Sequence, residues 1–300
     1  MPTDRPAQAH TGRAVAGRLA VRKTYKLYLG GAFPRSESGR SYPVHSPRGE
    51  LLAHAAQASR KDVRDAVLAA RKAVAGWSGA TGYNRGQVLY RVAELMDGRR
   101  EQFISEVQSA EGGTAAAARR QVDAAIDRWV HYAGWADKYP QIVGATNPVA
   151  GPYFAFSLPE PTGVVGVLAP QESSLLGLVS VLAPVLTTGN TAVAVASQTR
   201  PLPAVSLTEV LATSDVPGGV VNVLTGFTAE LAPWLASHRD VNGLDLTGVA
   251  DTDRVPLQVA AAENVKRVFS PRAEDWNAAP GIARMGAFVE TKSVWHPIGV

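Results

Sequence analysis

The sequence predicts an α/β fold, a doubly wound parallel β-sheet of the Rossmann type with helices on both faces. Two observations support this prediction. Residues 163–269 alternate between short β-like runs and helix-length apolar or amphipathic stretches, with short connections between them. The first run, Gly163–Ala169 (GVVGVLA), is apolar throughout, as expected of a strand that is covered on both faces of a parallel sheet.

The part of the chain before this alternation is predicted to be mainly helical. Tyr25–Gly31 is typical of a short strand that enters a glycine turn. Three helices are expected after it, because apolar side chains recur there at three- and four-residue spacing. They span 59–78, 84–103 and 115–136.

A β-hairpin is expected next, from β-like runs at 141–149 and 153–158 that are joined by Ala150–Pro152. The alternating region then follows, and the chain closes with a strand at 288–298. The strands expected in the alternating region are 163–169, 191–196, 220–224, 243–246 and 265–269. The helices expected between them are 175–186, 204–213, 228–237 and 255–262.

Composition excludes several classes of protein. The 300 residues include 46% apolar and 19% charged residues and carry a net charge of +4, which is typical of a soluble globular protein. The longest apolar-rich stretch, Leu175–Leu186, is too short to span a membrane. Six histidines lack metal-ligand spacing, and the basic residues lack the aromatic interleaving of a nucleic-acid interface. We therefore expect no metal, nucleic-acid or membrane partner and a cytoplasmic location.

Residues 1–24 differ from the rest of the chain, because they are rich in arginine and contain one acidic residue, Asp4. A secretory signal needs a continuous apolar segment, and Gly17 and Arg18 interrupt Ala14–Val21. We interpret this segment as a disordered basic tail. A transit peptide is the alternative.

One long segment resembles a known family. Gly163–Pro170 is followed by Leu175-Leu176, Leu182–Pro184 and Gly189–Thr191, in a pattern similar to the GVVGxIxPWNFPLL…LAPALAAGNTVV stretch of the NAD(P)-dependent aldehyde dehydrogenases. The resemblance extends from Lys26 to Gly248. Further matching blocks are 82–86, 131–137, 222–226, 237–241 and 290–299.

The resemblance implies a domain organisation. Residues 25–140 and 159–270 correspond to the family's cofactor-binding domain, and residues 141–158 and 286–300 correspond to its oligomerisation strands. In the family, these strands extend from one subunit toward another. Residues 271–285 are a short remnant in the place of the catalytic domain, which is largely missing from the predicted fold.

The chain departs from the family at the positions that carry its chemistry. It contains no cysteine, so it lacks the thiolate that attacks the aldehyde in the family. Glu172 stands where the family has the asparagine of its oxyanion hole, and a carboxylate repels an oxyanion. The Glu-Leu-Gly-Gly-Lys motif with the general base is replaced by a segment that contains Glu274 in a different context. We therefore predict no catalytic residue.

The cofactor motifs are degraded as well. Where the family has Lys-Pro-Ala/Ser-Glu against the ribose, this chain has Val195–Gln198, and where the family has a second glycine near the pyrophosphate, it has Asp253. Carboxylates oppose diphosphate binding at a helix N-terminus. NAD(P) binding is therefore possible only at a degraded site. The candidate cofactor-binding residues that remain are Ser197, Gln198, Gly226 and Gly248.

These features favour a catalytically inactive aldehyde dehydrogenase-like subunit that assembles with a complete aldehyde dehydrogenase, or with itself, through its hairpin and closing strand. Such a subunit would stabilise or regulate its partner. One alternative is a residual NAD(P)-binding sensor module, and another is an enzyme of different chemistry that uses Glu172 or Glu274. The last alternative is a protein that has lost its function by mutational decay.

Overall fold

The computed structural model describes residues 23–271 and 273–299. At its centre is a five-stranded sheet, all parallel, in the order β10-β9-β6-β7-β8. The chain builds the sheet outward from β6 through β7 to β8, and then returns past β6 to add β9 and β10 on the other side. The strands are β6 (Val164–Leu168), β7 (Thr191–Val195), β8 (Val221–Leu224), β9 (Gly243–Asp245) and β10 (Arg267–Phe269).

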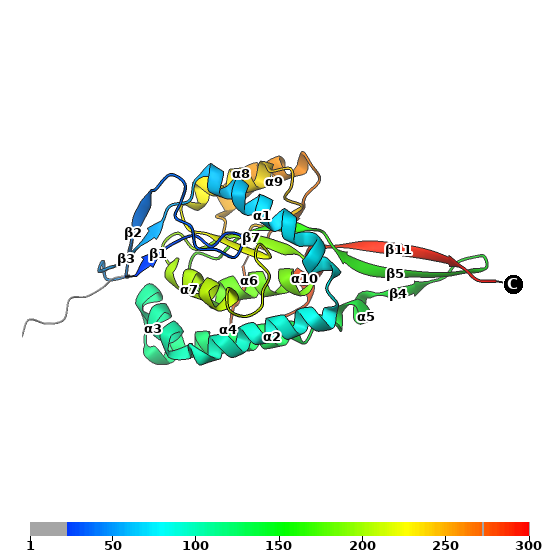
Figure 1. Cartoon of the computed structure of the whole chain (residues 1–300), viewed down its shortest axis with the longest axis horizontal. Coiled ribbons are helices and arrows are strands. Elements are labelled where there is room, and N and C mark those ends of the chain that lie inside the picture. The colour runs from blue at the N-terminus through cyan, green and yellow to red at the C-terminus, as the bar shows by residue number, and fades with distance from the viewer. Residues whose placement is uncertain (1–22, 272, 300) are drawn as a thin grey trace, which may run out of the picture.

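Helices cover both faces of this sheet (Figure 1), which confirms the predicted doubly wound α/β fold. One face carries α1 (Arg60–Gly79), α8 (Thr228–Ser237) and α9 (Asp251–Ala262). The other face carries α6 (Leu176–Thr187) and α7 (Leu202–Leu211), with the short α10 (Ala283–Ala287) against α6. An outer layer of helices packs on α6 and α7. It consists of α2 (Gly82–Gly98), α3 (Arg100–Glu111) and α4 (Ala115–Ala133).

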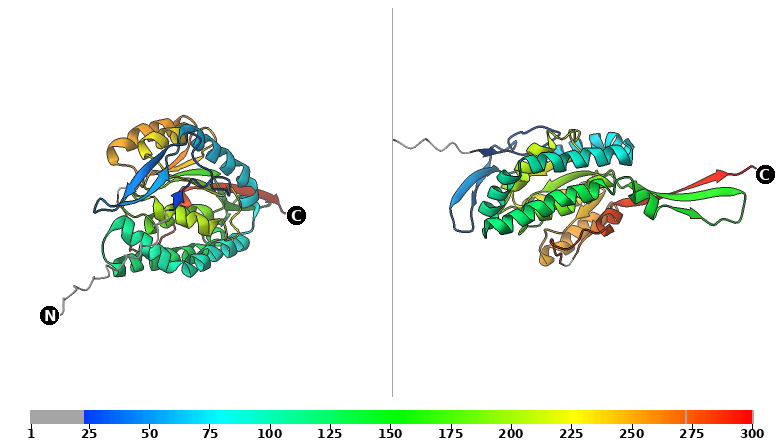
Figure 2. Two further views of the ribbon diagram at one scale, coloured as in Figure 1. Left: turned by 60° about the vertical axis from the view of Figure 1, so that its left-hand side comes forward. Right: turned by 90° about the horizontal axis from the view of Figure 1, so that it is seen from below.

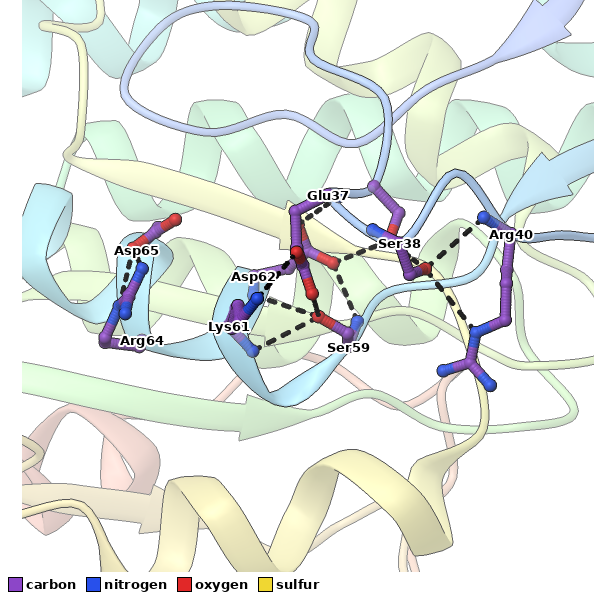
Figure 3. Close-up of polar contacts among 9 residues, drawn as sticks. Glu37, Ser38, Arg40, Ser59, Lys61, Asp62, Arg64 and Asp65 are labelled. Atoms are coloured by element: carbon purple, nitrogen blue, oxygen red, sulfur yellow. Dashed lines mark hydrogen bonds and ion pairs between the residues drawn. The ribbon is translucent and has the colours of Figure 1, made fainter.

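The N-terminus of α1 is fixed to the preceding loop by a polar network (Figure 3). The Ser59 hydroxyl accepts hydrogen bonds from the backbone N–H groups of Lys61 and Asp62, and the Asp62 carboxylate accepts from the Ser59 N–H at 2.7 Å, which forms a capping box. The same carboxylate accepts from the Ser36 hydroxyl at 2.7 Å and from the Glu37 N–H. These bonds hold α1 in place on the sheet face that it shares with α8 and α9.

Two smaller sheets lie outside the core. The first has the order β1-β3-β2 and lies at one end of the molecule, with β1 (Thr24–Tyr25), β2 (Ser41–His45) and β3 (Leu51–Ala56). The second projects from the opposite end (Figures 1 and 2). After α5 (Tyr139–Val143), it contains β4 (Ala145–Asn147), β5 (Tyr153–Pro161) and β11 (Val289–Pro297) in the antiparallel order β11-β5-β4.

Several details differ from the sequence prediction. The helix expected over 84–103 is divided between two helices, α2 and α3. Arg99 lies between them with φ −110° and ψ 15°, which are not helical values, and so ends α2. Residues 139–143 form a helical turn with a proline in its first turn, so only the end of the expected 141–149 strand is extended. Strands β2 and β3 were not predicted. Helix α9 begins at Asp251, earlier than expected.

The predicted basic tail falls mostly outside the described residues. Of residues 1–24, the structure describes Lys23 and Thr24. The Lys23 ammonium pairs with the Glu209 carboxylate at 2.6 Å, and Thr24 opens β1. Among the helices in the described part of the chain, none combines the length and apolar character needed to cross a membrane.

Candidate ligand site

A cavity of about 520 Å³ lies at the carboxyl ends of the central strands, between α8 and α9. Gln171 follows β6, Gln198 follows β7 and Gly248 follows β9, and all three line the cavity together with residues of the first turns of α8 and α9. The chain order reverses between β6 and β9. In open parallel sheets, this reversal point is where ligands bind.

Two glutamine side chains fix the loops at the cavity wall. The Gln171 amide donates to the Ala169 carbonyl at 3.0 Å, and its oxygen accepts from the Gln198 N–H at 2.9 Å. The Gln198 side-chain oxygen in turn accepts from the Thr228 N–H at 3.3 Å, at the start of α8. The ends of β6 and β7 are thus joined to the first turn of α8, and the Gln198 amide nitrogen has no bonding partner among the described residues.

Gly248 lies in the turn after β9, against the end of β6. Its N–H donates to the Leu168 carbonyl at 2.8 Å. A Cβ atom at this position would overlap the carbonyl group of Ala169 and lie 2.8 Å from the Leu168 carbonyl oxygen. Only glycine permits this approach of the β9–α9 turn to the end of β6. Gly248 thus packs against β6 and also lines the cavity.

The predicted cofactor residues are placed in two groups. Gln198 and Gly248 line the cavity, whereas Ser197 and Gly226 are absent from its lining. The buried Ser197 hydroxyl donates to the Gln171 carbonyl at 2.8 Å, and this bond holds the loop that follows β6. Gly226 has φ +148° and packs against Ala58 and Leu231, so its role in this structure is a tight turn. Val195, at the family's lysine position, is fully buried in the core.

The first turn of α9 is acidic. Asp253 lines the cavity, and Asp251 lies in the same turn with its side chain 85% exposed. The nearest cation on this helix is engaged elsewhere. Arg254 pairs with Asp251 at 3.3 Å and donates to the carbonyl groups of Val249 and Pro271 at 3.1 and 2.6 Å. The first turn of α9 therefore carries two carboxylates and one paired guanidinium, an acidic turn as the sequence predicted at this position, next to the partial positive charge of the helix N-terminus.

Residues 273–285 pack beside the cavity end of the sheet through polar contacts. The Arg128 guanidinium donates to the carbonyl groups of Trp276 and Ala278 at 2.6 and 2.7 Å and to the Ser180 hydroxyl at 2.9 Å. The Tyr132 hydroxyl donates to the Gly281 carbonyl at 3.1 Å. Residues 276–281 of the predicted remnant are thus bound to α4.

The two carboxylates considered as alternative catalytic groups have structural partners. Glu172 is exposed, and its side chain accepts a hydrogen bond from the Trp276 indole at 3.4 Å. Glu274 pairs with Arg284, which also pairs with the fully buried Asp245. Burial raises the pKa of the Glu274 carboxyl above its ordinary value, and the Arg284 guanidinium opposes this shift.

The fold and this site define a class of protein, the Rossmann-type α/β proteins that hold a ligand at the carboxyl ends of parallel strands. Within this class, the chain belongs to the aldehyde dehydrogenase family, whose sequence model matches residues 33–270. The mitochondrial aldehyde dehydrogenase family 2 member B4 of Arabidopsis thaliana is 36% identical over 250 residues, 81% of this chain and 45% of that relative. Human retinal dehydrogenase 2 is 32% identical over 87% of this chain and 51% of its own length.

Solved structures show the same relationship. An NAD⁺ complex of an aldehyde dehydrogenase from Bacillus cereus superposes with a TM-score of 0.78 at 27% identity, covering 82% of this chain and 50% of that one. An NAD-dependent aldehyde dehydrogenase from Sinorhizobium meliloti gives 0.78 at 29% identity, covering 85% and 51%. The chain spans about half the length of the curated relatives that it matches.

Sequence reasoning missed several residues of the site. Thr228 and the apolar residues of α8 and α9 line the cavity, and no motif marks them, whereas Gln171 occupies the tryptophan position of the family motif but was not among the predicted cofactor residues. Their common signal is positional, because each lies in the loop after a central strand or in the first two turns of the helix that follows it. Applying the switch-point rule to the predicted strands would have identified Gln171, which follows β6 at the point where the strand order reverses.

Proposed function

We propose that this chain is a catalytically inactive subunit that assembles with a complete, cysteine-bearing aldehyde dehydrogenase and stabilises or regulates it. The observation that carries this proposal is the projecting sheet β11-β5-β4 (Figure 2). The absence of cysteine removes the family's nucleophile from this chain. In the described part of the chain, no strand pairs with the outer edge of β11.

One face of the projecting sheet carries an apolar stripe along β5, beside His296 and Lys292 of β11. Strand alternation places Phe154, Phe156 and Leu158 of β5 on the same face, next to Val294 of β11. Phe154 and Leu158 are 48% and 41% exposed, and the Phe154 and Phe156 rings lie 5.6 Å apart. On the opposite face, the Tyr153 and Trp295 rings make an edge contact at 5.7 Å. Exposed apolar stripes and long unpaired edges are typical of surfaces that a protein partner covers.

The first experiment is the native mass and subunit composition of the tagged chain, purified from its own host. The proposal expects a stoichiometric second subunit that is a complete aldehyde dehydrogenase, together with a change in that enzyme's activity or thermal stability when this chain is omitted. The isolated chain is expected to show no aldehyde oxidation with NAD or NADP. A chain that oxidises aldehydes by itself, or that forms only homo-oligomers in the presence of complete family members, would contradict the proposal.

A substitution tests the surface itself. Phe154→Arg is expected to reduce the recovered partner at least tenfold, because burying a phenylalanine side chain is worth about 1.5–3 kcal/mol and a buried arginine adds a desolvation cost. Quantitative affinity capture with the identified partner measures the loss. The matched control is Tyr90→Arg on α2, which changes an aromatic side chain of equal exposure (50%) far from the projecting sheet. Equal recovery with both variants would exclude this face.

A further inference from the structure

We propose that a basic hollow on the outer face of the β1-β3-β2 sheet binds a single phosphate-type dianion, either free phosphate or the phosphate group of a small phosphorylated molecule. The hollow has a volume of about 140 Å³ and is lined by residues 24–26, 35–36, 39–41, 54 and 56. It lies at the end of the molecule opposite the projecting sheet and shares no residue with the cavity between α8 and α9. This inference does not rest on the proposed subunit role.

Strand alternation gives the hollow its polar side chains. The apolar residues of the small sheet lie on its inner face and pack with the start of α7 in a separate core cluster. Successive side chains of a strand point to opposite faces, so the chain neighbours of these apolar residues fall on the outer face. Lys26, Ser41 and His54 are such neighbours, and all three line the hollow.

The loop before β2 adds two arginines to the same hollow. Arg35 and Arg40 both line it, and between them a turn is closed by a hydrogen bond from the Gly39 N–H to the Ser36 carbonyl at 2.9 Å. The Arg40 Nε donates to the Ser38 hydroxyl at 3.4 Å, and the guanidinium points away from the capping box of α1 (Figure 3). Its two terminal nitrogens have no hydrogen-bond partner among the described residues, so they are free to donate to a ligand.

The hollow has positive charge without a counter-charge. Lys26, Arg35 and Arg40 form no ion pair within the part of the chain that the structure describes, and the lining contains no described carboxylate. The nearby acids are occupied, because Glu37 pairs with a lysine of α1 at 3.1 Å and Asp62 is part of the capping box. Cations that share one hollow repel one another, and a dianion between them replaces this repulsion with charge-assisted hydrogen bonds.

Size and donor type limit the ligand. Sites for whole small molecules usually enclose about 300–1,000 Å³, so a hollow of about 140 Å³ admits one anionic group rather than a nucleotide. Guanidinium groups match the geometry of phosphate oxygens, and the Ser41 hydroxyl and the His54 ring can each donate a further hydrogen bond. Both of these residues are exposed, so the rest of a phosphorylated molecule can extend into solvent.

Equilibrium dialysis of the full chain against radiolabelled phosphate measures this binding directly, at constant ionic strength with chloride as the balancing anion. We expect saturable binding of a single phosphate per chain. Unlabelled glycerol 3-phosphate distinguishes the two sources. Stronger competition than by unlabelled phosphate assigns the site to a phosphate ester, and equal or weaker competition assigns it to the free ion. Binding that does not saturate, or no binding up to about 10 mM phosphate, overturns the proposal.

A charge substitution tests the role of the cations. Arg40→Gln is expected to weaken phosphate binding about tenfold or more, because it removes a charged donor from the hollow. The matched control is Arg48→Gln, which removes an exposed arginine between β2 and β3, in the same small sheet but outside the lining. The control is expected to change the affinity less than about twofold. Equal weakening by the two variants would indicate diffuse attraction to a basic surface and refute the site.

A second substitution tests the shape of the hollow and leaves its cations in place. Ser41→Phe puts an aromatic ring into the hollow and is expected to abolish phosphate binding. His45→Phe is the control, because His45 lies at the other end of β2, is equally classed as exposed and does not line the hollow. Phenylalanine is favoured at exposed strand positions, and thermal unfolding verifies that both variants fold. Phosphate binding at full affinity in Ser41→Phe would place the anion elsewhere and overturn the assignment.

Discussion

Replacing Gly248 with alanine is expected to lower the free energy of unfolding by about 3 kcal/mol or more. The added Cβ would overlap the carbonyl group of Ala169, and the atoms in its way belong to the backbone at the end of β6, which cannot rotate aside. Relief requires the β9–α9 turn to move away from β6. That movement breaks the hydrogen bond from the Gly248 N–H to the Leu168 carbonyl and opens the floor of the cavity.

A second glycine provides the matched control. Gly76 lies in the interior of α1, is exposed, and has no atom within 4 Å of the position its Cβ would take. Gly76→Ala is therefore expected to raise the free energy of unfolding by about 0.5–1 kcal/mol, since alanine is the better helix former. Urea titration of both variants measures the two changes. A Gly248→Ala protein as stable as the parent would show that β6 and the turn are not in this close contact.

The central fold was predictable because the physical signal of a buried parallel strand is strong and local. Runs such as Gly163–Ala169 have no polar position, so a strand with both faces covered is the structure that satisfies them. Strands β2 and β3 lack this signal. Strand β2 contains Pro43 and alternates between buried and exposed residues, and its register depends on pairing with β3 rather than on its own composition.

The site was only partly predictable for a different reason. Gln198 and Gly248 carry positions of a family motif, so the resemblance identified them, and both line the cavity. Gly226 occupies a motif position too, but the space beside it is filled by Ala58, from a distant part of the chain, and by Leu231 of the following helix. The distinction between a glycine kept for a ligand and one kept for packing depends on tertiary contacts, which a motif does not contain.

Replacing Arg284 with methionine is expected to cost about 3–5 kcal/mol, because it leaves the Asp245 carboxylate without its counter-ion. The Arg284 side chain is 6% exposed and that of Asp245 is fully buried. Besides the ion pair, the guanidinium donates to the Thr247 hydroxyl at 3.0 Å, pairs with Glu274 and lies 4.4 Å from the centre of the Phe269 ring. Methionine preserves most of the side-chain volume, so the measured loss reports mainly on charge.

The control for this prediction is a solvent-exposed ion pair on the surface of the same protein. Arg267 and Glu290 form a two-bond contact at 2.6 Å, with side chains 40% and 54% exposed, and Arg267→Met is expected to cost less than about 1 kcal/mol. The double variant Asp245→Asn with Arg284→Met removes both buried charges. It is expected to be more stable than Arg284→Met alone, with a coupling energy above about 1 kcal/mol.

This cycle also decides what segment 271–285 does in the fold. Arg284 comes from this segment, and Asp245 comes from the end of β9, an inner strand of the sheet. A large coupling energy means that the segment unfolds together with the core, because the buried Arg284–Asp245 pair holds it against the end of the sheet. Additive effects of the two substitutions would mean that the segment rests on the sheet without being required by it. Urea unfolding of the four proteins distinguishes the two cases, because only a shared buried interaction makes the losses non-additive.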